Sequence, residues 1–116
     1  MIYGLKEQVI DQIIAVLAGF PQVEEAILYG SRAMGNFKPG SDIDLALKGN
    51  LLNLHVLNSI SRLLNNLSIP YTVDLSIYHR IDNTDLLDHI NRVGVVLYQK
   101  SKTQTRIADS TKVVVQ

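Results

Sequence analysis

Two aspartates on one face of an expected strand carry the clearest chemical signal in this sequence. Asp42 and Asp44 open an apolar run that extends to Leu47. Side chains two positions apart on a strand point to the same side, so both carboxylates face one way while Ile43 and Leu45 face the other. At 4 Å two such charges repel by about 4 kcal/mol at an effective dielectric constant near 20, and a divalent cation would reverse that repulsion. The alternative is a solvated strand start after the preceding Pro-Gly turn.

A glycine-serine pair, Gly30-Ser31, lies upstream of these aspartates, directly after a short apolar run at 26–29. We expect a tight turn that leads into a short helical turn. Glycine there lets another group approach the backbone, and free N–H groups with a serine hydroxyl suit a phosphate oxygen. The segment is not a Walker A loop, because no Gly-Lys-Ser/Thr follows at the required spacing. By itself, the pair is better explained as an ordinary turn.

A third aspartate lies on a different expected strand. Residues 71–78 alternate between apolar and polar side chains, which predicts a strand, and Asp74 is the charged residue in the middle of its polar face. The alternative for Asp74 is a solvated strand aspartate with no role in a site.

Other metal chemistry has little support. The sequence has no cysteine, which excludes disulfides and thiolate metal sites. His55, His79 and His89 show no metal-ligand spacing, and we expect them to be surface or packing residues.

Composition favours one folded domain. The chain has 116 residues, 47% of them hydrophobic, and its formal net charge is zero, which is a poor match for a protein that grips nucleic acid through phosphates. We expect no membrane segment, because the longest apolar run, 13–20, is too short to cross a bilayer. The start of the sequence lacks the basic and apolar regions of a signal peptide, so we expect a cytoplasmic protein.

Apolar periodicity predicts an α/β domain in which helices and strands alternate. We expect helices over about 5–17, over 51–66 with Asn50 as its N-cap, and from caps at 82–84 to Gly94. Strands are expected at 26–29, 42–47, 71–78 and 95–98, with Glu24 and Glu25 as solvated loop charges. The strand residues that should form one buried face under the middle helix are Ile43, Leu45, Leu47, Val73, Leu75 and Ile77. We expect a folded domain over 1–99 and a polar tail over 100–116.

The combined motif resembles the nucleotidyltransferase superfamily of DNA polymerase beta. It consists of Gly30-Ser31, ten residues, the run Asp42-Ile43-Asp44-Leu45, and Asp74 about thirty residues further on. It is most similar to the minimal nucleotidyltransferases (MNT type), small prokaryotic domains that often occur beside a helical HEPN-type protein as toxin–antitoxin pairs. The resemblance covers residues 5–98 and implies the nucleotidyltransferase fold, a mixed central β-sheet covered by helices.

The resemblance also implies roles for the acidic residues. Asp42, Asp44 and Asp74 would be the catalytic residues and would bind two Mg²⁺ ions, which prefer such hard oxygen ligands. Asp74 could also accept the proton of the attacking hydroxyl.

On the phosphate side, the resemblance implies that Gly30, Ser31 and Arg32 bind the triphosphate of ATP or another nucleoside triphosphate. For Arg32 the alternative is a surface residue. Met34 stands where the family commonly has a second basic residue, so the triphosphate would meet less positive charge here.

Two functions remain open from the sequence. The first is metal-dependent transfer of a nucleoside monophosphate, AMP from ATP, to a hydroxyl of a partner protein, with a HEPN-type toxin as the expected partner. The second is a non-catalytic antitoxin that neutralises a helical partner by forming a complex. The neutral charge and the lack of a further domain for a template or primer argue against a polymerase. A homo-oligomer is possible on either view.

Overall fold

A four-stranded mixed sheet forms the centre of the computed structural model, which describes residues 1–100. The strand order is β3-β2-β1-β4. Strand β1 pairs antiparallel with both of its neighbours, whereas β2 and β3 run parallel. The bounds are β1 Glu25–Tyr29, β2 Ile43–Lys48, β3 Val73–Ile77 and β4 Val95–Gln99. The expected mixed α/β sheet is therefore confirmed.

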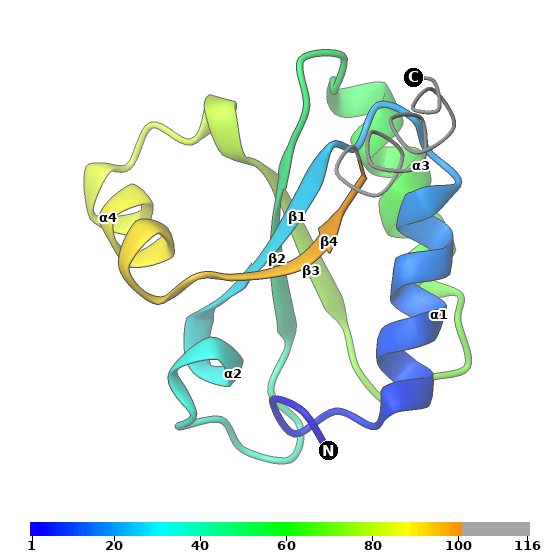
Figure 1. The fold of residues 1–116 in the computed structure, drawn as a ribbon, viewed down its shortest axis with the longest axis vertical. Coiled ribbons are helices and arrows are strands. Elements are labelled where there is room, and N and C mark those ends of the chain that lie inside the picture. The colour runs from blue at the N-terminus through cyan, green and yellow to red at the C-terminus, as the bar shows by residue number, and fades with distance from the viewer. Residues whose placement is uncertain (101–116) are drawn as a thin grey trace, which may run out of the picture.

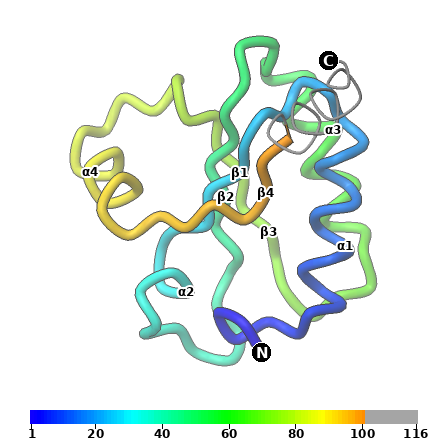
Figure 2. The backbone as a smooth tube through the Cα atoms, viewed as in Figure 1, coloured from blue at the N-terminus to red at the C-terminus, as the bar shows by residue number. Residues whose placement is uncertain are grey.

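Helices cover the two faces of this sheet unequally. The two twelve-residue helices, α1 (Glu7–Ala18) and α3 (Leu54–Asn65), lie side by side on one face, and α4 (Thr84–Val93) lies on the other (Figure 1). The short helix α2 (Gly30–Met34) follows β1 directly, and a 3₁₀ turn, η1 (Tyr78–Arg80), follows β3. In the backbone trace α4 stands apart from α1 and α3, with the sheet between them (Figure 2).

The main core lies between the sheet and the pair α1 and α3. Ile43, Leu45 and Leu47 of β2 are fully buried there, and Val73 and Ile77 of β3 are almost fully buried. Leu75 is half-buried and packs against the same cluster. The predicted buried face is confirmed, because alternate residues of adjacent strands present one continuous apolar surface to the helices.

A smaller cluster on the opposite face holds α4 against the sheet. Its buried members are Ile27, Tyr29, Ala46 and Ile90. Asn83 caps α4 by accepting a hydrogen bond from the Leu86 N–H at 3.0 Å, and the helix ends at Gly94, as the sequence predicts.

Two local predictions are wrong. The N-cap of α3 is Asn53, whose Oδ1 accepts a hydrogen bond from the Val56 N–H at 2.9 Å, because residues 49–52 form a turn before the helix begins. Glu25 is a strand residue rather than a loop charge. Its carboxylate lies 3.7 Å from the Lys48 ammonium on the neighbouring strand and accepts a hydrogen bond from Gln99 at 3.0 Å.

The described part of the chain ends just after β4. Lys100 still belongs to the folded structure, since its backbone N–H donates to the Glu24 carbonyl and its ammonium donates to the Pro21 carbonyl. The predicted polar tail covers 100–116, and its residues 101–116 lie outside the described part of the chain. Within residues 1–100, no helix combines the length and the apolar character needed to cross a membrane.

Because one face of the sheet is apolar and the other carries the aspartates, core substitutions should destabilise the fold and acidic substitutions should not. Leu45→Ala should lower the free energy of unfolding by about 2–5 kcal/mol, because Leu45 is fully buried, and Leu75→Ala should cost less. Asp42→Asn should not destabilise the fold. Urea denaturation of the three variants, with Leu63→Ala on the exposed side of α3 as control, measures the difference. An Asp42→Asn protein less stable than Leu45→Ala would contradict this layout.

Candidate functional site

Three side chains lie across one rung of the sheet on the face opposite α1 and α3. Tyr29 of β1 pairs with Asp44 of β2, which in turn pairs with Asp74 of the parallel strand β3. Residues in register on adjacent strands point to the same face, so the two carboxylates are neighbours. Tyr29 is buried, Asp44 is half-buried and Asp74 is exposed. The tertiary structure thus brings together the two aspartates that are thirty residues apart in the sequence.

Asp42 lies just before β2 rather than within it and is exposed to solvent. Its charge still acts on the rung. Burial raises the pKa of the Asp44 carboxyl above its usual value, the charge of Asp74 raises it further, and that of Asp42 adds to the shift. The three predicted carboxylates therefore share one electrostatic environment, with Asp44 at its centre.

The carboxylates form an acidic cluster without the arrangement of a preformed metal site, so nucleotide phosphates would have to supply further ligands. In the described part of the chain, no group of three or more His, Cys, Asp or Glu side chains is arranged to hold one metal ion. Asp44 and Asp74 share a face, and Asp42 approaches from the segment before β2.

Gly30 contacts the central carboxylate from the end of β1. Its φ of +76° lies in the left-handed region that favours glycine. A Cβ at this position would collide with Oδ2 of Asp44, so any other residue would displace the carboxylate. Gly30 and Asp44 are thus parts of one site, and Gly30 begins the short helical turn predicted from the sequence.

The N–H of Gly30 is not free, contrary to the expectation from the sequence. It donates a hydrogen bond to Nε2 of His89 at 3.0 Å. Ser31, the other predicted phosphate ligand, follows in the first turn of α2 and is half-buried.

His89, which the sequence did not single out, also lies at this site. His89 lies on α4, half-buried, and its ring packs edge-on against Tyr29 with 6.1 Å between ring centroids and 80° between ring planes. Its position three residues after Leu86 and directly before Ile90 places it on the apolar face of α4. A histidine on the apolar face of a helix was the only sign in the sequence that His89 has a buried contact. Its hydrogen-bond partner, Gly30, is 59 residues away, so the sequence does not reveal the pair.

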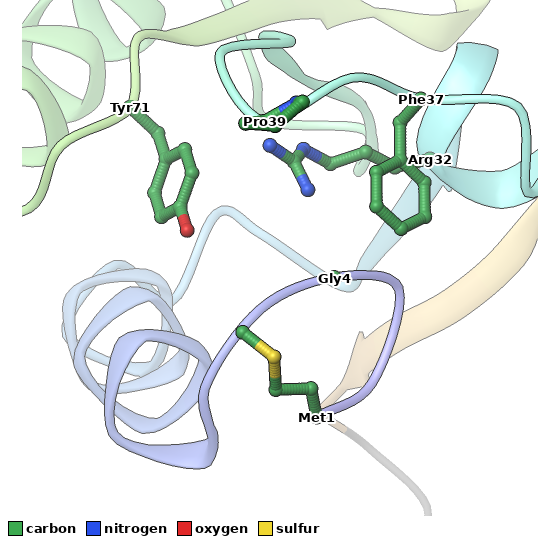
Figure 3. Close-up of a pocket in the computed structure, with 6 residues that line it drawn as sticks. All are labelled: Met1, Gly4, Arg32, Phe37, Pro39 and Tyr71. Atoms are coloured by element: carbon green, nitrogen blue, oxygen red, sulfur yellow. The ribbon is translucent and has the colours of Figure 1, made fainter.

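Arg32 is buried, with 1% of its surface exposed, so its interpretation as a surface residue is wrong. Its guanidinium donates to the Ser41 carbonyl from Nε at 3.2 Å and from Nη2 at 2.9 Å, and to the Tyr3 carbonyl from Nη1 at 3.0 Å. The guanidinium also lies between two aromatic rings, 5.1 Å from the centre of Phe37 and 4.8 Å from that of Tyr71 (Figure 3).

These contacts explain why Arg32 is held at the wall of a cavity of about 510 Å³, whose other lining residues are Met1, Gly4, Phe37, Pro39 and Tyr71. All three guanidinium nitrogens have backbone partners. The contacts of Arg32 anchor the segment before β2, and phosphate binding by this residue stays a prediction. Met34 is about half exposed on α2.

Solved structures share this fold at low sequence identity. A chain of a toxin–antitoxin complex crystallised with AMP-PNP aligns with a TM-score of 0.64 and 18% identity, over 96% of this chain and 95% of that one. A chain of the complex between a tri-AMPylated Shewanella oneidensis HEPN toxin and an MNT antitoxin aligns with a TM-score of 0.63 and 20% identity, over 95% of this chain and 86% of that one. A chain of the MntA–HepT toxin–antitoxin complex aligns with a TM-score of 0.62 and 16% identity, over 95% of each chain.

Comparison with curated proteins found no match. A family model described as polymerase beta, nucleotidyltransferase matches residues 11–103, which include the Gly-Ser turn, all three aspartates and His89. The match extends over most of the sequence, and the structural neighbours share the fold. The chain therefore belongs to the polymerase beta nucleotidyltransferase family.

Proposed function

We propose that this domain transfers AMP from ATP to a hydroxyl of a partner protein, and that the partner is a small helical HEPN-type toxin. The observation that carries the proposal is the rung of Asp44 and Asp74 beside Gly30, with Asp42 at its edge. Clustered carboxylates supply the oxygen ligands that metal-dependent phosphoryl transfer uses.

The acidic cluster fits a divalent cation on chemical grounds. Hard carboxylate oxygens are the ligands that Mg²⁺ prefers, and nucleotide phosphates complete its coordination in many enzymes. The pKa of Asp44 is raised because burial and two neighbouring carboxylates disfavour its charge. Asp42, Asp44 and Asp74 would hold two Mg²⁺ ions, which supply charge stabilisation at the attacking and leaving oxygens.

The chain's own residues have separate tasks in this proposal. Ser31 contacts the triphosphate, and Gly30 leaves room for the Asp44 carboxylate. The hydroxyl oxygen of the acceptor attacks the α-phosphorus, the bond between this phosphorus and the bridging oxygen breaks, and pyrophosphate leaves. Asp74, which is exposed at the edge of the rung, takes the hydroxyl proton.

The partner is proposed from the structural neighbours. One neighbouring complex contains an AMPylated HEPN toxin and another contains AMP-PNP, a non-hydrolysable ATP analogue. An acceptor on a protein also agrees with the composition of the chain, because a net charge of zero does not favour a nucleic-acid substrate.

The raised pKa of Asp44 predicts that stability depends on pH. A carboxyl whose pKa is raised by folding favours the folded state fully below its unfolded pKa of about 3.9, and this contribution is lost as the pH rises through the folded pKa. Asp44→Asn should therefore raise the melting temperature at pH 7 without metal, and the gain should disappear towards pH 3. Mg²⁺ should raise the melting temperature of the wild type more than that of the variant.

Thermal melts from pH 3 to pH 8 measure this effect, with Asp11→Asn on the exposed side of α1 as the control. An Asp44→Asn gain that is the same at every pH would show that the carboxylate charge is not its cause.

The proposed reaction is tested by incubating the purified chain with ATP, Mg²⁺ and a small helical HEPN-type toxin as the candidate partner, followed by intact mass measurement. The partner should gain the mass of one or more AMP units, and a chain carrying both Asp42→Asn and Asp44→Asn should leave it unmodified. Complex formation with no mass gain, and equal neutralisation of the partner by both chains, would instead support the non-catalytic antitoxin.

A separate role for Asp74 predicts a split between binding and turnover. Asp74→Asn should keep most of the ATP affinity, because Asp42 and Asp44 remain, and it should lose about 10²–10⁴-fold in single-turnover rate. Ser76→Ala, two residues further along the same face of β3, is the matched control. Transfer by Asp74→Asn at the wild-type rate would remove Asp74 from the site.

A further inference from the structure

We propose that His89 is a positioning residue that fixes Gly30, and through Gly30 the carboxylate of Asp44, in the geometry that the site needs. The inference concerns the same site as the proposed AMP transfer and rests on it for its functional meaning. Its structural content, the restraint of Gly30 by α4, can be measured on the isolated chain.

The bond between His89 and Gly30 joins parts of the fold that the sequence keeps far apart. Nε2 of His89 accepts from the Gly30 N–H at 3.0 Å, across 59 positions of the chain. An imidazole that accepts at Nε2 is neutral and carries its proton on Nδ1. The edge-on contact with Tyr29 fixes the plane of the ring, and Tyr29 is the residue directly before Gly30.

Gly30 in turn limits where the Asp44 carboxylate can lie. Its left-handed backbone brings the Cα so close to this carboxylate that a Cβ would overlap with Oδ2. The amide of Gly30 therefore faces His89 while its Cα faces Asp44. A shift of the glycine away from His89 would change the space open to Asp44 and the path of the chain into Ser31.

Helix α4 is well placed to be this restraint. It packs on the same face of the sheet as the acidic rung, anchored by Ile90 in the smaller core. In Figure 1, α4 and α2 lie on the same side of the sheet, away from α1 and α3. Because the Gly30 N–H is engaged by His89, the phosphate contacts expected of the Gly-Ser turn fall on Ser31.

If His89 restrains Gly30, substitutions of His89 should differ according to whether the new side chain can accept the hydrogen bond from the Gly30 N–H. His89→Gln can place its amide oxygen near the position of Nε2, His89→Asn is too short to reach it, and His89→Phe keeps an aromatic edge for Tyr29 without any acceptor. Hydrogen exchange of the Gly30 amide, followed by NMR without nucleotide or metal, should accelerate in His89→Phe and His89→Asn and stay slow in His89→Gln.

The consequence for the site is measured as ATP affinity in the presence of Mg²⁺. His89→Phe and His89→Asn should bind ATP about two- to tenfold more weakly, the range expected for one hydrogen bond, and His89→Gln should stay close to wild type. His55→Phe on the exposed side of α3 serves as the control. If the three His89 variants behave alike, or if His89→Phe binds ATP more tightly, the positioning role is wrong.

The failure of this inference and that of the proposed function are distinguishable. An unmodified partner protein, together with the predicted pattern of exchange and ATP affinity, would reject AMP transfer and keep His89 as the residue that positions Gly30. AMP transfer by the wild type, together with unchanged hydrogen exchange of the Gly30 amide in His89→Phe, would support the proposed function and reject the positioning role of His89.

Discussion

The contact between a glycine backbone and a carboxylate is the constraint on which the site depends. Gly30 and Asp44 can lie together only because residue 30 has no Cβ and adopts a left-handed conformation. The antiparallel pairing of β1 and β2 creates this contact, because it sets Tyr29 opposite Asp44 and so places the next residue, Gly30, beside the carboxylate. The start of α2 and the acidic rung are thereby fixed relative to one another.

The sheet separates the demands of stability and chemistry between its two faces. Residues 43, 45 and 47 of β2 point into the main core, whereas Asp44 points to the face that carries α4. The mutual repulsion of the carboxylates destabilises the folded state. The apolar face offsets this, since burial of each large aliphatic side chain stabilises the fold by about 1.5–3 kcal/mol. The pKa of Asp44 is raised first by its burial and then by the nearby charges of Asp74 and Asp42.

Two side chains distant in sequence hold the segments that flank the acidic cluster. Arg32 binds the carbonyl of Ser41, the residue directly before Asp42, and so anchors the chain as it enters β2. His89 binds the N–H of Gly30, at the point where the chain leaves β1. The buried guanidinium has aromatic rings and backbone carbonyls around it, which partly replace the water that it loses.

The sequence by itself determined the elements, the buried face and the candidate acids. Alternation and helical periodicity are local properties, so the strands around Leu45 and Val73 and the family motif from Gly30 to Asp74 can be recognised without a structure. The tertiary structure decided the rest. The pairing of Asp44 with Asp74, the burial of Arg32 and the bond from His89 to Gly30 join residues far apart in the chain, and only the packing of α4 and the register of the strands bring them together.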